Sequence, residues 1–179
     1  MHAYQKQYTT VAVPKLTEHT QYVSPYLVPK LEKVVINMGT GDILAAGKNM
    51  DEAAAFLSAI SGQKAVITKS TKAIAGFKIR QGMPVGLKVT LRGKRMQDFM
   101  IKLTQVVLPR TRDFRGVKPS SIASNGSMHL GIKDSVVFPE VANGSFQHPL
   151  QVSMVVTPAC SPEAARILFE SLGFVFQTN

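Results

Sequence analysis

Alternating apolar and polar residues in three short segments constrain the fold of this 179-residue chain more than any other feature. Residues 87–92 (LKVTLR) alternate aliphatic with polar side chains, and residues 128–132 and 150–156 carry similar apolar rows. Successive side chains of a β-strand point to opposite faces, so each segment predicts a strand with one apolar and one polar face. Strands of this kind are typical of an antiparallel sheet with helices packed on one side only.

A longer period predicts the helices. Apolar residues at positions i, i+3, i+4 and i+7 form one helix face in three segments. The last of these has Ser161 as N-cap, Pro162 at the first helical position and Gly173 beyond its end. The order of helices and strands predicts an α+β fold. The expected helices cover residues 2–12, 49–60, 95–108 and 161–172, and a further strand covers residues 33–38.

The length suits one domain, and we expect residues 1–179 to form a single domain. Because Cys160 is the one cysteine, an intrachain disulfide is excluded, and we expect this residue to be partly buried before the last helix. No run of 18 apolar residues occurs, which argues against a membrane span. Residues 70–86 and 109–126 fit no regular element, and loops this long in a compact domain are usually functional or disordered.

The positive charge of the chain is concentrated in one third of its length. Residues 61–118 contain fourteen Lys and Arg but only two acids, Asp98 and Asp113, which leaves a net charge of +12, whereas the remainder carries −2. A concentrated cationic segment points to a polyanion, namely nucleic acid or an anionic membrane face. A merely Lys-rich exposed surface is the alternative, although such surfaces usually interleave acidic residues.

Patterns typical of enzymes and metal sites are missing from the sequence. Residues 41–49 follow a predicted strand as a P-loop would, but five residues separate Gly41 from Gly47, and Asn49 replaces the Ser or Thr that would hold magnesium. The four histidines are far apart, no C-x-x-C pair exists, and no G-x-S-x-G motif occurs. We therefore expect no enzymatic activity, no metal and no cofactor.

Three groups of basic or polar residues are candidate nucleic-acid contacts. In the 70–86 loop, cations flank Phe77 and Ile79, a combination suited to a phosphate backbone and a stacked base; alternatively, these two side chains fold back and anchor the loop. The polar strand faces supply amides, hydroxyls and cations that suit RNA, or they form a merely hydrated surface. A third group follows a helix C-terminus, where the helix dipole would also favour cations; it consists of Arg110, Arg112 and Arg115.

Seven motifs in unbroken order carry a family resemblance. The most extended lie at residues 61–69 (SGQKAVITK), 75–82 (AGFKIRQG) and 88–93 (KVTLRG). Shorter motifs lie at residues 35–39 (VINMG), 110–116 (RTRDFRG), 131–133 (GIK) and 138–140 (FPE). Together they closely resemble the bacterial-type large-subunit ribosomal protein L5 family, which binds 5S rRNA. Several linked motifs are far more specific than any single one.

The resemblance implies a structural, non-catalytic protein of the central protuberance of the large ribosomal subunit, in the bacterial cytoplasm or in a mitochondrial or plastid matrix. It implies that the sheet face opposite the helices docks 5S rRNA, that the 70–86 loop reaches the P-site tRNA, and that another face bridges to a small-subunit head protein. Further implied partners are 23S-type rRNA and neighbouring proteins of the central protuberance.

The resemblance also implies the contact residues. Those for 5S rRNA are Asn37, Met38, Gly39, Gln63, Lys64, Thr68, Lys88, Thr90 and Arg92. Those for tRNA are Lys72, Phe77, Lys78, Arg80 and Gln81, and the candidate bridge or RNA patch is Arg110, Arg112 and Arg115. Residues 122–126 and 141–148 carry fewer charges than the family usually has there, so the resemblance identifies no bridge residues in these segments.

A general nucleic-acid-binding or chaperone module outside the ribosome is the alternative function. Such a module would bind varied duplexes with similar affinity and a steep dependence on salt. A dedicated ribosomal protein would instead prefer one RNA strongly.

Overall fold

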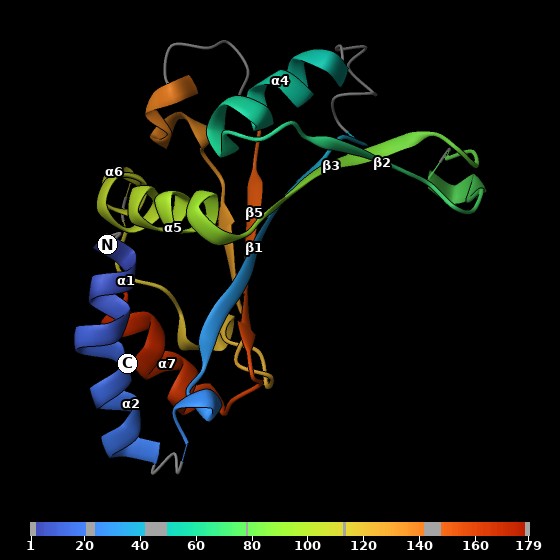
Figure 1. The fold of residues 1–179 in the computed structure, drawn as a ribbon. Coiled ribbons are helices and arrows are strands. Elements are labelled where there is room, and N and C mark those ends of the chain that lie inside the picture. The colour runs from blue at the N-terminus through green and yellow to red at the C-terminus, as the bar shows by residue number, and fades with distance from the viewer. Residues whose placement is uncertain are drawn as a thin grey trace. The chain divides into compact units, whose positions relative to one another are not determined.

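The computed structural model describes residues 3–20, 24–41, 50–77, 79–112, 114–141 and 148–177. Five strands form one antiparallel sheet in the spatial order β2-β3-β1-β5-β4 (Figure 1). With the helices that pack on it, this sheet makes an α+β fold, which confirms the predicted fold class. The strands are β1 (Lys30–Gly39), β2 (Val66–Lys69), β3 (Pro84–Leu91), β4 (Met128–Ile132) and β5 (Leu150–Thr157).

The alternation in the sequence decides which side of each strand is buried. In β3, Leu87 and Val89 are buried, whereas Lys88 between them is exposed. The predicted apolar row of β5 is buried throughout, and that of β4 is buried at Met128 and Ile132. The period-two pattern therefore predicted the buried faces of these strands.

The chain folds as two compact units, each built from separate stretches of sequence. The first, here called the helical unit, comprises residues 1–34, 91–130 and 152–179. The second, the hairpin unit, comprises residues 35–90 and 131–151.

The helical unit begins with a continuous helix that is longer than the 2–12 segment expected from the sequence. Apolar side chains of this helix are buried at Ala12 and at Leu16, beyond the expected end. The burial of Leu16 explains the extension, because tertiary packing stabilises helical turns whose sequence pattern is weak. The helix consists of α1 (Ala3–Gln7), a π-helical turn η1 (Tyr8–Ala12) and α2 (Val13–Thr20).

A second continuous helix of this unit consists of α5 (Gly93–Lys102), a π-helical turn η4 (Leu103–Val107) and α6 (Leu108–Arg110). Its predicted core residues Met96, Phe99, Met100 and Leu103 are all buried. The helical backbone continues through Pro109 to Arg110, past the expected end at Leu108, and ends where Thr111 adopts an extended conformation with φ −68° and ψ 128°.

The third helix, α7 (Pro162–Ser171), begins as predicted. The Ser161 hydroxyl accepts a hydrogen bond from the Ala164 N–H at 3.3 Å, which satisfies one free donor of the first turn. The predicted face of Ala165, Leu168, Phe169 and Leu172 is buried. Within the helical unit α2 packs on α7, and α1 packs on α5.

The hairpin unit contains α4 (Met50–Ser61) and the β2–β3 hairpin. The predicted face of α4 is buried at Ala53, Phe56, Leu57 and Ile60, whereas its expected cap, Asn49, lies outside the described residues. The sequence pattern does not predict β2, because Val66 and Ile67 are consecutive apolar residues rather than alternating ones. Both remain exposed in the structure.

Candidate nucleic-acid interface

The hairpin unit presents a set of polar residues on the strand face opposite its buried apolar rows. Lys88 is exposed and Thr90 half-buried on β3, and Asn37 is exposed on β1. Thr68 of β2 lies opposite Gly86 of β3 in the antiparallel register. We call this set the polar sheet surface: Asn37, Gly39, Thr68, Gly86, Lys88 and Thr90.

Gly86 brings the side chains of two neighbouring strands close together on this surface. A β-carbon built on Gly86 would lie 3.0 Å from the Thr68 hydroxyl oxygen and 4.0 Å from the Asn37 side-chain oxygen. It would also lie 3.2 Å from the Met38 carbonyl oxygen. Gly86 itself is buried, so the Thr68 hydroxyl and the Asn37 amide lie close to its backbone, an approach that a side chain at this position would hinder.

Gln63 and Lys64 lie in the connection from α4 to β2. The Gln63 side-chain amide donates to the Thr90 carbonyl at 3.2 Å, which joins this connection to β3. The Ser61 hydroxyl donates to the Gln63 carbonyl at 2.9 Å and so fixes the turn itself. Lys64 is exposed. The structure thus gathers Gln63, Thr68, Lys88 and Thr90 within one unit.

Met38 differs from its neighbours in the implied RNA-binding motif. Its side chain is fully buried, at 0% exposure, whereas Asn37 and Gly39 on either side are exposed. Met38 therefore offers a ligand only its backbone, and its side chain belongs to the core.

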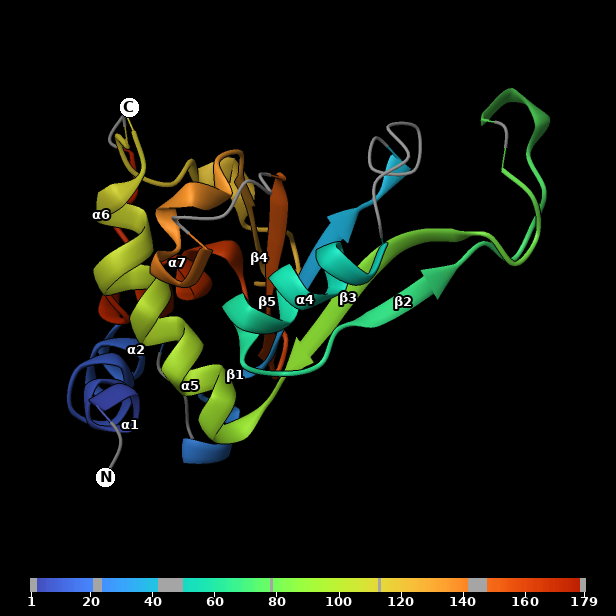
Figure 2. The ribbon, with the colours of Figure 1, turned by 90° about the horizontal axis from the view of Figure 1, so that it is seen from above.

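The basic loop covers residues 70–83, because β3 already begins at Pro84 rather than after residue 86 (Figure 2). Backbone hydrogen bonds close its base, from Ser70 N–H to the Met83 carbonyl at 2.8 Å and from Gly82 N–H to the Ser70 carbonyl at 2.9 Å. Ile74 and Ile79 form an antiparallel bridge farther along. The described residues of the loop therefore extend the hairpin through backbone hydrogen bonds.

Phe77 is 75% exposed near the tip of this loop, so the interpretation that it folds back as an anchor is wrong. Ile79 is half-buried and engages Ile74 through the backbone, which agrees with an anchoring role for that residue. Lys78 lies outside the described residues. The other implied tRNA-contacting side chains, Lys72, Arg80 and Gln81, are exposed.

Arg92 belongs to the helical unit and is held by an acidic partner that the sequence analysis did not identify. Its guanidinium donates to a Glu32 carboxylate oxygen at 2.7 Å, and the Thr157 hydroxyl donates to the second oxygen at 2.8 Å. The hydrogen bond from Arg92, followed by that from Thr157, lowers the pKa of Glu32. The Arg92 side chain is thereby positioned, and its charge is partly compensated.

The arginines that follow α6 are all exposed: Arg110, Arg112 and Arg115. Arg110 is the last residue of α6, so the helix dipole favours its charge, as the structural interpretation expected. Arg112 and Arg115 lie beyond the helix end, where the dipole no longer explains them.

Within the part of the chain that the structure describes, the side chains that could bind a metal ion lie apart from one another. There, the His, Cys, Asp and Glu side chains form no group of three that could hold a metal ion, and none of the helices is long and apolar enough to cross a membrane. Cys160 is half-buried before α7, as predicted, and burial raises its pKa. Most of the P-loop-like segment, residues 42–49, lies outside the described residues.

Two contributors to the site were missed from the sequence. A glycine inside a strand often marks a close backbone approach, so Gly86 had a detectable signal. Glu32 had none, because it pairs with Arg92 sixty residues away along the chain.

The sequence matches two models that describe one protein family. Residues 24–80 match the model for ribosomal protein L5, and residues 84–176 match the model for the C-terminus of the ribosomal L5 family. Two similar proteins are the large ribosomal subunit proteins uL5 of Streptococcus pyogenes strains NZ131 and Manfredo. Each is 46% identical to this chain over 172 residues, which covers 96% of both proteins.

Proposed function

The chain belongs to the ribosomal protein L5 family, and from that membership we propose that it binds 5S rRNA in the central protuberance of the large ribosomal subunit. The family is structural and non-enzymatic, so the function is binding without turnover. The relatives compared are bacterial, and the location they indicate is the large ribosomal subunit in the bacterial cytoplasm. Residues 1–179 would act as one RNA-binding domain.

The polar sheet surface carries this proposal. The Asn37 and Thr68 side chains both lie beside Gly86, and the Gln63 amide is hydrogen-bonded to β3, so amide and hydroxyl groups lie in preset positions. Such groups suit the 2′-hydroxyls and base edges in the shallow minor groove of A-form RNA. Lys64 and Lys88 add exposed charge for the phosphates, which supplies affinity while the polar groups recognise shape.

The test measures 5S rRNA affinity for variants of the polar sheet surface. Asn37→Ala and Thr90→Val each remove one hydrogen-bonding group, and we expect each to weaken binding by about 1 to 3 kcal/mol if the RNA buries that group. Gln105→Ala removes an exposed amide in the helical unit and serves as the matched control. Unchanged binding by both surface variants, or equal affinity of the wild type for an unrelated RNA duplex, contradicts the proposal.

The 70–83 loop is proposed to contact the P-site tRNA. The support is its ordered base, its exposed cations and the exposed ring of Phe77, which is available to stack on a base. Because the loop contacts are separate from the polar sheet surface, Lys72→Ala combined with Arg80→Ala should leave 5S affinity nearly unchanged. The same variant should weaken P-site tRNA binding to reconstituted ribosomes, whereas Lys6→Ala with Lys15→Ala should not. Loss of 5S binding by the loop variant would reverse the assignment.

The proposal also includes contacts with 23S-type rRNA, with neighbouring central-protuberance proteins and with a small-subunit head protein. Exposed Arg112 and Arg115 are available for such contacts, since the helix dipole does not account for them.

A further inference from the structure

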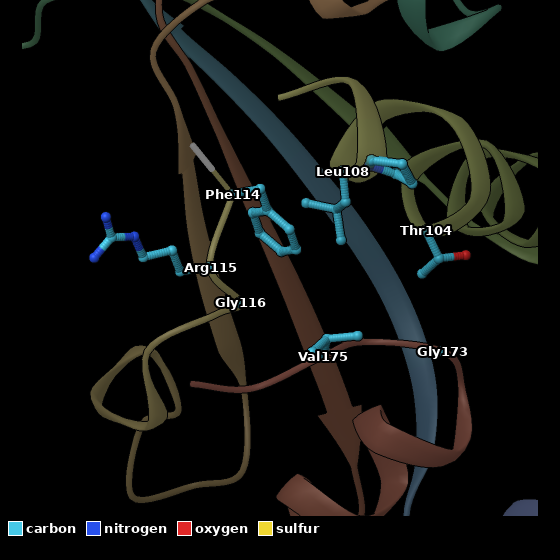
Figure 3. Close-up of a pocket in the computed structure, with 8 residues that line it drawn as sticks. Thr104, Leu108, Phe114, Arg115, Gly116, Gly173 and Val175 are labelled. Carbon is cyan, nitrogen blue, oxygen red and sulfur yellow. The ribbon is translucent and has the colours of Figure 1, made fainter. Parts of the chain in front are cut away.

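A cavity of about 430 Å³ opens beside the arginines of the helical unit (Figure 3). Three segments wall it: the end of the α5–α6 helix, the loop after α6, and the chain that follows α7. In Figure 3 the side chains of Leu108, Phe114 and Val175 surround the cavity, while the Arg115 side chain extends away from it. Its lining residues are Thr104, Leu108, Pro109, Phe114, Arg115, Gly116, Gly173 and Val175.

The wall formed by the C-terminal segment is rigidly placed. Val117 N–H donates to the Val175 carbonyl at 2.7 Å, and Gln177 N–H donates to the Val117 carbonyl at 2.9 Å. Phe174 and Phe176 are buried on one side of this segment, so the intervening Val175 faces the other way and is 63% exposed. An aliphatic side chain is thus held in water at the edge of an ordered cavity.

The side chains around the cavity offer a ligand little hydrogen bonding. The Thr104 hydroxyl already donates within its own helix, to the carbonyls of Met100 at 3.0 Å and Ile101 at 3.3 Å. The other side chains that point toward the cavity are apolar. A nucleobase inserted here would lose water from its polar edge atoms without replacement, which costs free energy, whereas an apolar side chain loses nothing.

One wall of the cavity belongs to a basic stretch of the chain, which favours an acidic partner. Residues 109–118 contain four basic residues and one acidic residue, Asp113. Arg112, Arg115 and Lys118 are exposed. Interfaces commonly combine an apolar anchor in a pocket with arginines at the surrounding surface.

From these observations we infer that the cavity is a docking site for an acidic polypeptide segment, which inserts an apolar side chain between Leu108, Phe114 and Val175. The cations around the opening contact the acidic residues that flank this anchor. The inference deepens the proposed contacts with ribosomal proteins, because it states the chemistry of the partner segment and the cavity that receives its apolar side chain. It rests on the proposed function only in that the partner is sought on the ribosome.

The experiment places a photo-cross-linker in the cavity of the full-length chain. Val175→p-benzoylphenylalanine is incorporated into ribosomes as the sole copy of the protein, irradiated, and mapped by mass spectrometry and by reverse transcription of the rRNA. The control is Val11→p-benzoylphenylalanine, since Val11 is 37% exposed on η1, outside the cavity lining. We expect Val175 to cross-link to a polypeptide at an acidic segment and Val11 not to reach that segment.

Charge reversal provides the second arm. Arg112→Glu with Arg115→Glu, added to the Val175 cross-linker chain, should lower the yield of this cross-link roughly tenfold through like-charge repulsion. Lys6→Glu with Lys15→Glu should not lower it. A cross-link to rRNA, a cross-link to a basic segment, or no cross-link overturns the inference. Measuring 5S rRNA affinity on the same protein separates this failure from failure of the proposed function.

Discussion

Gly116 is a position where the structure predicts a large effect of adding a single methyl group. Its φ of +104° is a backbone conformation that residues with a β-carbon rarely adopt. A β-carbon there would lie 2.9 Å from the Phe176 carbonyl carbon, 2.9 Å from the Gln177 nitrogen and 3.0 Å from the Val175 carbonyl oxygen. All three are backbone atoms of the segment that forms one wall of the cavity.

The cost of Gly116→Ala has two parts. A non-glycine residue in a sparsely populated backbone region costs about 1 to 3 kcal/mol. Overpacking against atoms that cannot rotate away adds about 1 to 3 kcal/mol. We therefore expect the free energy of unfolding to fall by roughly 2 to 6 kcal/mol, which corresponds to a decrease in Tm of about 4 to 24 °C for a chain of this length.

Urea unfolding followed by far-UV circular dichroism measures this loss, and two other glycines separate its parts. Gly62 has a φ of +66°, and no atom would lie within 4 Å of a β-carbon added there. Gly62→Ala should therefore show the free-energy cost of the backbone conformation without the cost of steric overlap. Gly131 has neither feature, and Gly131→Ala should be nearly neutral. If Gly116→Ala destabilises the protein no more than Gly62→Ala does, the overlap with the C-terminal segment is not real and the reasoning fails.

Three further predictions concern the core, the Arg92 contact and the polar sheet surface. Phe169→Ala removes a fully buried ring that packs edge-on against Phe174 at 5.6 Å, and urea unfolding should show a loss of about 3 to 5 kcal/mol; a loss below about 1 kcal/mol contradicts the packing. Because the folded-state pKa of Glu32 is lowered, its contacts stabilise the protein above the ordinary value of 4.5 and are lost as the pH falls through the folded pKa. Glu32→Gln should therefore be less stable than the wild type at pH 7, with the difference disappearing in acid; a pH-independent difference argues against the ion pair. Gly86→Ala should displace the Thr68 hydroxyl, which would lie only 3.0 Å from the added carbon, and so weaken 5S rRNA binding, whereas full affinity would exclude that hydroxyl from the RNA site.

The strands and helices with strong periodicity could be predicted from the sequence because their burial follows a local rule. The alternation in residues 87–92 and the helical spacing in residues 96–103 each specify a buried face without reference to the rest of the chain. The four residues of β2 lack such a pattern. They form a strand because β3 lies beside them and supplies backbone partners, which is a tertiary effect.

For Met38, the alternation of buried and exposed residues along the strand predicts the position of the side chain better than the family motif does. Alternation with Val34 and Ile36 assigns its side chain to the buried face, and all three are buried. The motif implied an RNA contact at Met38 because it groups residues by their order in the chain and does not distinguish side chain from backbone. Asn37 and Gly39, on the opposite face, are exposed as an RNA contact requires.

The sequence by itself determined the fold class, the faces of the periodic elements and the concentration of cations in residues 61–118, since each depends only on residue type and spacing. Tertiary structure decided which of those cations are compensated and which polar groups lie together. Glu32 meets Arg92, Asn37 and Thr68 border Gly86, and the C-terminal segment closes one wall of a cavity beside the arginines. These relations depend on the pairing of segments far apart in the chain, and the local spacing of residue types does not specify that pairing.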